Sequence, residues 1–133
     1  MRRLTPFVLA VLVTVPAVGA DAPLTGPEFD ALSQGKTLFY SSGSEPYGVE
    51  EYLPGRKVRW AFVGDQCMEG YWYEEAEFIC FVYDRQPIPQ CWTFYDTPQG
   101  LMARFRGDPE GMPLVAVEES PEPLACAGPD VGV

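Results

Sequence analysis

The stretch that decides the fold is residues 77–96, which read Glu77-Phe78-Ile79-Cys80-Phe81-Val82-Tyr83-Asp84-Arg85-Gln86-Pro87-Ile88-Pro89-Gln90-Cys91-Trp92-Thr93-Phe94-Tyr95-Asp96. Two runs rich in aromatic and β-branched residues, 77–84 and 90–96, flank a Pro-containing linker, a pattern typical of two antiparallel strands in a hairpin. Both alternating faces of these strands are apolar. One face is therefore expected to line a core, and the other to be covered by a helix, the C-terminal tail or a partner.

Six further runs of the same texture lie around this hairpin and predict strands at 36–42, 47–53, 57–64, 69–74, 100–106 and 113–118. The links between them are short, and no helix-length segment separates any two strands, so parallel crossovers are excluded. An open sheet of eight strands would leave two edges free to aggregate. The sequence therefore predicts an all-β fold, an antiparallel up-and-down meander that closes into a small barrel or a strongly curled sheet.

One short helix is expected before the strands, at residues 26–34. Thr25 can act as its N-cap with Glu28 three residues later, the spacing of a capping box. Phe29 and Leu32 form an apolar pair on one face, and Gly35 suits the position just after the helix end. A helix this short is not stable alone, so it must dock on the sheet.

The first twenty residues have the pattern of a secretory signal peptide. Arg2 and Arg3 precede an apolar run from Phe7 to Val13, and the segment ends in the small residues Val18-Gly19-Ala20. We expect cleavage to leave Asp21 as the N-terminus of one domain, residues 21–133, in the periplasm or outside the cell. No later stretch has the length of a membrane span.

All four cysteines, Cys67, Cys80, Cys91 and Cys126, lie after this leader, an even number that predicts two disulfides in an oxidising compartment. A hairpin register with Asp84 opposite Pro87 would place Cys80 opposite Cys91, leaving Cys67 to pair with Cys126. The alternative is Cys67–Cys80 with Cys91–Cys126. Residues 119–133 have the composition of a frayed tail, which Cys126 would hold in place.

Charge and composition exclude several classes of function. The chain has a net charge of −10 and no histidine. Nucleic-acid binding is disfavoured, because it needs clustered Lys and Arg. The widely spaced cysteines do not form a metal site, and no cofactor motif is present. The commonest general base is also missing. No catalytic residue and no metal ligand is assigned.

Two sets of residues remain as candidates for chemistry or binding. Paired carboxylates could hydrolyse a glycosidic bond across a groove, but acidic residues at strand turns are usually only solvated. The pairs are Glu50 with Glu51, Asp65 with Glu69, and the group Glu74, Glu75 and Glu77. Aromatic residues could form a stacking platform, but in a small barrel they more often fill the core, and we expect Trp60, Phe81 and Trp92 to be mostly buried. The platform candidates are Tyr71, Trp72, Tyr73, Trp60, Trp92 and Tyr95.

A family resemblance rests on elements spread over the mature chain: Lys36-Thr37, residues 47–56, Trp60, Cys67, Gly70, Trp72-Tyr73, Ile79-Cys80-Phe81, Tyr83 and Cys91-Trp92. With these elements the chain resembles small exported proteins of alphaproteobacteria, of the Rhodobacter type, that have no assigned function. The resemblance implies a periplasmic or secreted domain. The resemblance implies no activity and no site residues for this chain.

The sequence favours an exported, non-enzymatic domain that binds a small-molecule ligand or an envelope partner that it does not identify. One alternative is a small hydrolase that uses paired carboxylates such as Asp65 and Glu69. Another is a structural or inhibitory protein with an exposed aromatic patch, which would require Trp72 or Trp92 to be exposed.

Overall fold

The computed structural model describes residues 3, 9–14 and 22–126. Most of the predicted signal peptide, including its cleavage site between Ala20 and Asp21, lies outside the described residues. Residues 9–14 form no helix or strand. Among the described residues, no helix has the length and apolar character needed to cross a membrane.

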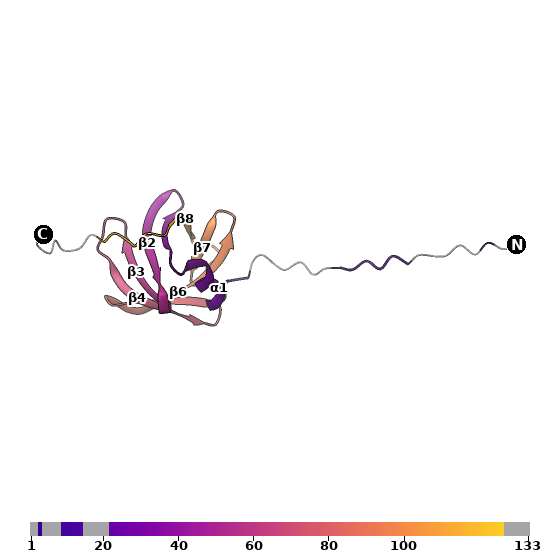
Figure 1. Cartoon of the computed structure of the whole chain (residues 1–133), viewed down its shortest axis with the longest axis horizontal. Coiled ribbons are helices and arrows are strands. Elements are labelled where there is room, and N and C mark those ends of the chain that lie inside the picture. The colour runs from indigo at the N-terminus through magenta and orange to yellow at the C-terminus, as the bar shows by residue number, and fades with distance from the viewer. Residues whose placement is uncertain (1–2, 4–8, 15–21, 127–133) are drawn as a thin grey trace, which may run out of the picture.

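Eight antiparallel strands follow one another around a closed barrel, each paired with its neighbours in the chain (Figure 1). The first strand also pairs with the last, which closes the barrel and leaves no free edge. The predicted fold class is thus confirmed. The strands are β1 (Thr37–Ser42), β2 (Glu45–Leu53), β3 (Lys57–Phe62), β4 (Met68–Glu75), β5 (Phe78–Tyr83), β6 (Gln86–Thr97), β7 (Gly100–Phe105) and β8 (Leu114–Ser120).

The hairpin β5–β6 agrees with the prediction at its centre and differs at its tip. Cys80 pairs with Cys91, as expected. Asp84 does not pair with Pro87, however, because Tyr83 pairs with Gln86 and the turn is only two residues long. The register shifts between Phe81 and Tyr83, and the prolines of β6 lie beside this irregularity. Proline cannot donate to a strand ladder, so the chain accommodates it at a bulge.

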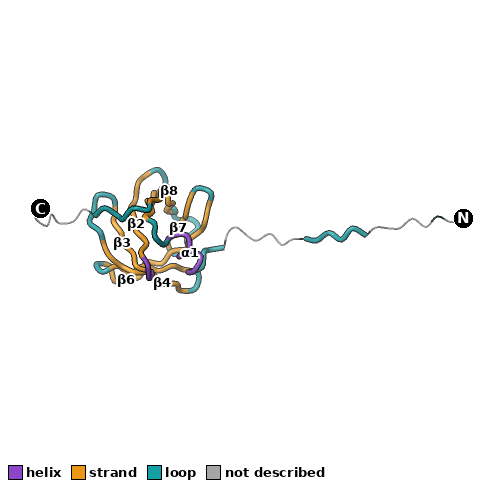
Figure 2. Tube along the Cα trace, viewed as in Figure 1, coloured by secondary structure: helices purple, strands orange, loops and turns teal. Residues whose placement is uncertain are grey.

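The helix α1 (Gly26–Ser33) begins and ends as its sequence predicts. Thr25 and Glu28 form both hydrogen bonds of a capping box, and Gly35 has a positive φ of 79°. A short 3-10 turn, η1 (Pro54–Arg56), links β2 to β3. Figure 2 shows α1 beside the strands, with the loops at both ends of the barrel.

The alternation of up and down strands gives the barrel two distinct ends. Helix α1 lies at the end where β1 starts, called here the helix end. Its Phe29 is 0% exposed, and its ring centroid lies 4.5 Å from that of Phe94 and 5.1 Å from that of Trp72. The helix therefore closes the barrel at the helix end and covers no outer face. The opposite end, called the open end, carries the β1–β2, β3–β4, β5–β6 and β7–β8 connections.

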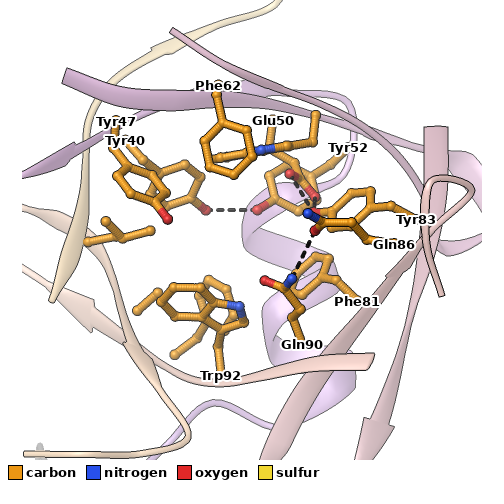
Figure 3. Close-up of a pocket in the computed structure, with 14 residues that line it drawn as sticks. Tyr40, Tyr47, Glu50, Tyr52, Phe62, Phe81, Tyr83, Gln86, Gln90 and Trp92 are labelled. Carbon is orange, nitrogen blue, oxygen red and sulfur yellow. Dashed lines mark hydrogen bonds between the residues drawn. The ribbon is translucent and has the colours of Figure 1, made fainter. Parts of the chain in front are cut away.

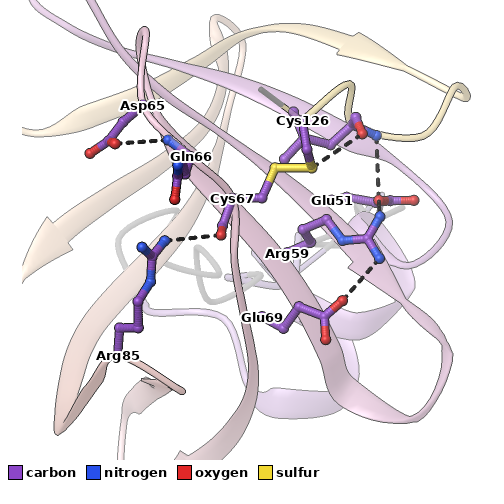
Figure 4. The surroundings of a disulfide bond; sticks show 9 residues. Glu51, Arg59, Asp65, Gln66, Cys67, Glu69, Arg85 and Cys126 are labelled. Carbon is purple, nitrogen blue, oxygen red and sulfur yellow. Dashed lines mark hydrogen bonds and ion pairs between the residues drawn. A yellow bond between two sulfur atoms is a disulfide. The ribbon is translucent and has the colours of Figure 1, made fainter. Parts of the chain in front are cut away.

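The C-terminal segment 121–126 runs along the outside of the barrel to the open end (Figure 4). Thr37 donates a hydrogen bond to the carbonyl of Glu122, and the amide of Leu124 donates one to Glu51. The disulfide Cys67–Cys126 ends the described segment, with Cα atoms 5.5 Å apart. The second disulfide, Cys80–Cys91, bridges β5 and β6. Both predicted pairings are confirmed.

The tail covers β2 and β3, where polar residues lie outside. Arg59 contacts Glu51 at 3.7 Å and Glu69 at 3.1 Å there. The outer face of β5 and β6 is covered instead by the loop after β7, since Gly107 lies against Phe78 and Thr93. Arg104 holds this loop by donating to the carbonyls of Pro109 and Gly111.

Candidate functional site

The interior of the barrel forms a cup that opens away from α1 (Figure 3). Its walls are mainly aromatic and come from most of the strands. The aromatic lining residues are Tyr40, Tyr47, Tyr52, Trp60, Phe62, Phe81, Tyr83, Trp92 and Phe94, and the polar ones are Glu50, Gln86 and Gln90. Ligand sites in proteins typically combine such apolar walls with a few polar groups.

The free space in the cup is small. It amounts to about 50 Å³ when measured as room for the centres of water-sized molecules. Aromatic side chains between α1 and the cup fill the rest of the barrel interior. A cavity of about 150 Å³ holds a benzene ring, so the cup is too small to enclose a whole ring or a lipid chain. It can take the small polar end of a ligand whose larger part lies at the opening.

Two tyrosines meet within the cup. Tyr40 and Tyr52 are 4% and 2% exposed, and their hydroxyl oxygens lie 2.7 Å apart. Burial raises the pKa of both hydroxyls. Figure 3 shows this pair across the cavity from Trp92. The two hydroxyls form a polar spot in an otherwise apolar wall.

Among the described residues, Glu50 is the one carboxylate that lines the cup. It is 2% exposed, and both of its carboxylate oxygens lie 2.9 Å from the hydroxyl of Tyr83, which donates to them. No Lys or Arg among the described residues lies within ion-pair distance of it. Desolvation raises the pKa of the Glu50 carboxyl well above its usual range, and the hydrogen bond from Tyr83 opposes that shift. Burial likewise raises the pKa of Tyr83.

The sheet makes room for these side chains at one glycine. Gly48 in β2 pairs with Phe62 in β3, next to Trp60. A Cβ atom at Gly48 would overlap the indole ring of Trp60 and would lie 2.8 Å from the carbonyl oxygen of Ala61. The absence of a side chain at Gly48 thus lets the indole ring of Trp60 lie close against β2 and form one wall of the cup.

The mouth of the cup has a polar pair and an apolar rim. Gln90 donates to the side chain of Gln86 at 2.9 Å. Large hydrophobic side chains are also exposed to solvent on the loops and strand ends of the open end. Six of the eight exposed large hydrophobic residues between positions 22 and 126 lie here: Tyr47, Phe62, Val63, Ile88, Phe105 and Met112. Apolar side chains gathered at one place on a surface mark an interaction site.

A second hollow lies at the helix end, between the β6–β7 turn and the end of β8. It is roomier, about 390 Å³ by the same measure. Lys36, Asp96 and Glu119 are among its lining residues. Lys36 is already paired with Glu119 at 3.3 Å. No buried polar group points to a ligand there, so the cup is the stronger candidate.

The structure separates the carboxylates that the sequence suggested as pairs. Glu50 faces the interior, whereas Glu51 lies on the outer face beside Arg59. Asp65 accepts a bond from the amide of Gln66, and the exposed Glu69 pairs with Arg59. Neither of these two lines the cup or the second hollow.

The group at Glu74, Glu75 and Glu77 does not form a site either. Glu74 accepts a hydrogen bond from the amide of Gly26 at the start of α1. Glu75 lies within 4.8 Å of the sulfur atoms of Cys80 and Cys91, but both sulfurs belong to the disulfide and cannot act as thiolate ligands.

The aromatic candidates divide between core, cup and surface. Trp60, Trp72 and Phe81 are buried, as expected from the core interpretation. Trp92 is only partly buried, because it stands at the mouth of the cup, where its ring centroid lies 5.0 Å from that of Phe105. Tyr71 and Tyr73 lie outside on β4, with ring centroids 6.4 Å apart. No single platform forms.

Sequence reasoning missed the tyrosines and glutamines of the cup, namely Tyr40, Tyr52, Tyr83, Gln86 and Gln90. The strand alternation carries a signal for the first three, because residues of the same parity face the same side. In β2 the parity of Tyr52 also places Glu50 inside, where a carboxylate is unexpected. Comparison with known proteins adds no relative: no protein-family model, curated protein or solved structure matches this chain.

Proposed function

We propose that this protein is an exported binding domain for a small, one-ring ligand, whose polar end enters the cup while its ring lies at the mouth. The observation that carries the proposal is the cup itself, an aromatic cavity that is closed by α1 at one end and open at the other. Contact between an apolar ring and the apolar side chains at the mouth is favourable at about 25 cal/mol per Å² of apolar surface removed from water.

The apolar rim supports the same proposal. Phe62, Ile88 and Phe105 are 37%, 78% and 42% exposed at the mouth. Side chains of this kind are costly to leave in water unless they meet another surface. Their position around the opening gives a ligand, or a partner that delivers it, an apolar approach to the cavity.

Binding explains the site better than hydrolysis by paired carboxylates. That mechanism needs two carboxyl groups about 5–10 Å apart across a groove. Of the lining residues in the described part of the chain, only Glu50 carries a carboxyl group. The two disulfides are compatible with an oxidising compartment, which supports the exported location.

The test is a titration of the oxidised chain with 2-phenylethanol, a neutral one-ring alcohol, followed by tryptophan fluorescence and by NMR shifts of the Ala103 methyl group. Ala103 lines the cup and is 2% exposed. We expect saturable shifts at Ala103.

A matched pair of variants locates the binding site. Gln90→Trp places a large ring in the mouth and should abolish the shifts. Gln99→Trp makes the same change in the β6–β7 turn at the helix end and should leave them intact. Binding that survives Gln90→Trp, or no binding to the unmodified chain, would contradict the proposal.

A further inference from the structure

We infer that the ligand carries a protonated amine, which Glu50 binds as an ion pair inside the cup. This inference rests on the proposed function and names the chemical class of ligand for the same cavity. Its starting point is that Glu50 is the only charged residue among the described residues that line the cup. A buried carboxylate is costly unless a cation or several hydrogen bonds compensate it.

The bonds that Glu50 makes within the chain leave most of its acceptor capacity unused. An ionised carboxylate offers about four acceptor positions. Tyr83 supplies a single hydroxyl proton to the two oxygens. No ion pair to Glu50 exists within residues 22–126. A ligand with two or three N–H donors would complete the carboxylate's set of partners.

The aromatic walls suit a cation as well as a ring. A positive charge is attracted to the face of Trp or Tyr at a distance of about 6 Å or less from the ring centroid, and the attraction grows when water is excluded. Tyr40, Trp60 and Trp92 all line the cup with Glu50. The same walls hold an uncharged ring by apolar contact, so they alone do not select an amine. Glu50 supplies the selection.

The charge around the mouth has the matching sign. The loops and strand ends at the open end expose five carboxylates, at Glu45, Asp65, Asp84, Asp108 and Glu110, against two arginines, Arg85 and Arg106. With a net charge of −10 for the whole chain, the field at the opening favours the approach of cations over anions.

Ionisation of Glu50 links amine binding to pH. The titratable groups that face Glu50 are Tyr40 from β1, Tyr52 from β2 and Tyr83 from β5. Burial raises the pKa of all three hydroxyls above their usual value of 10, so they stay neutral between pH 5 and 9. The raised pKa of Glu50 means that an arriving ammonium group displaces a proton from it. Amine affinity should therefore rise with pH over this range.

The experiment compares 2-phenylethylamine with 2-phenylethanol, which differ only in an ammonium group against a hydroxyl. On the oxidised full chain at pH 8 we expect the amine to bind at least about tenfold more tightly, the size expected for hydrogen bonds to a charged group. Glu50→Gln keeps the shape and a hydrogen bond to Tyr83 but removes the charge. It should remove the tenfold preference and change the alcohol's affinity by no more than about twofold.

The control variant is Glu51→Gln, which makes the same change one residue later, on the outer face. It should leave both affinities unchanged. If Glu50→Gln does not fold, calorimetry of the unmodified chain in two buffers of different ionisation enthalpy replaces it. Release of about one proton on amine binding, with an affinity that rises from pH 5 to 8, supports the inference.

The outcomes separate the two proposals. Equal affinity for amine and alcohol, or a preference that survives Glu50→Gln, overturns the amine assignment and leaves the cup and its mouth as a binding site for neutral one-ring ligands. Binding of neither probe overturns the proposed function, and the amine assignment with it.

Discussion

Tyr83 reaches across from β5 to place its hydroxyl 2.9 Å from both carboxylate oxygens of Glu50 in β2. The two strands are not neighbours in the sheet, so this bond spans the barrel interior. The hydrogen bond joins polar side chains from two separate walls of the cup. The chemistry of the cavity therefore depends on how the barrel closes as well as on which residues line it.

Replacement of Glu50 by Gln should change how stability depends on pH. The pKa of Glu50 is raised by folding, so the folded chain holds its proton to a higher pH than the unfolded chain does. The stabilising contribution is complete below the ordinary pKa of 4.5 and is lost as pH rises toward the folded pKa. The slope is up to about 1.4 kcal/mol per pH unit.

The measurement is urea unfolding of both proteins at several values between pH 4 and 8. Relative to the unmodified chain, Glu50→Gln should become steadily more stable as pH rises. Other carboxyl groups, such as Glu28 with its lowered pKa, are common to both proteins and cancel in the comparison. A pH-independent difference would mean that Glu50 titrates normally in the folded chain.

Truncation of Phe29, the side chain by which α1 closes the barrel, should strongly destabilise the protein. Phe29→Ala removes a fully buried ring that contacts Tyr52, Trp72 and Phe94, and it should lower the free energy of unfolding by about 3–5 kcal/mol. Phe105→Ala is the control, because Phe105 is 42% exposed at the rim and should cost less than about 1 kcal/mol. Equal costs in urea unfolding would show that α1 does not hold the barrel closed.

A methyl group at Gly48 should disturb the cup from outside the ligand site. Gly48→Ala forces the Trp60 ring away from β2, and overpacking of this kind costs about 1–3 kcal/mol. The near-ultraviolet circular dichroism of the tryptophans should change with it. Gly111→Ala is the control, since a Cβ there meets nothing closer than 3.4 Å. An unchanged spectrum for Gly48→Ala would contradict the role given to this glycine.

Loss of the tail disulfide should free the tail and leave the barrel folded. Cys67→Ala/Cys126→Ala removes a cross-link over 59 residues, worth up to about 4 kcal/mol by the loop-entropy relation. Hydrogen exchange should show faster exchange at the amide of Leu124, which donates to Glu51. The amides of the Cys80–Cys91 hairpin should keep their protection. Equal loss of protection in both regions would show that the tail is part of the barrel's cooperative unit.

Local patterns were enough to predict the strands, the helix and the Cys80–Cys91 disulfide, and the pairing of Cys67 with Cys126 followed only as the remainder. The Thr25 and Glu28 capping box and the Cys80–Cys91 pairing depend on residues close in sequence, where spacing rules apply directly. The prediction for the tip of the β5–β6 hairpin was wrong. Pro87 and Pro89 lie within β6, where a bulge accommodates them. Proline normally indicates a loop, and only the paired strand shows how it is tolerated.

The candidate site could not be predicted from local sequence patterns. Glu50 and Tyr83 are 33 residues apart, and the bond between them follows from the shear and closure of the whole barrel. The paired glutamates looked alike in the sequence, yet strand alternation puts Glu50 inside and Glu51 outside. Trp92 carries the same apolar signal as Trp60, although its place at the open end leaves it partly exposed.

The pairing of β1 with β8 also sets the order in which the chain can fold. Thr37 pairs with Ser120, so one edge of the first strand has no partner until the last strand has joined the sheet. Contacts between such distant residues slow folding, because a long loop must close before they form. Neighbouring hairpins can assemble earlier, but the interior becomes a cup only when this final seam forms. The candidate site is therefore complete only once the first and the last strands have paired.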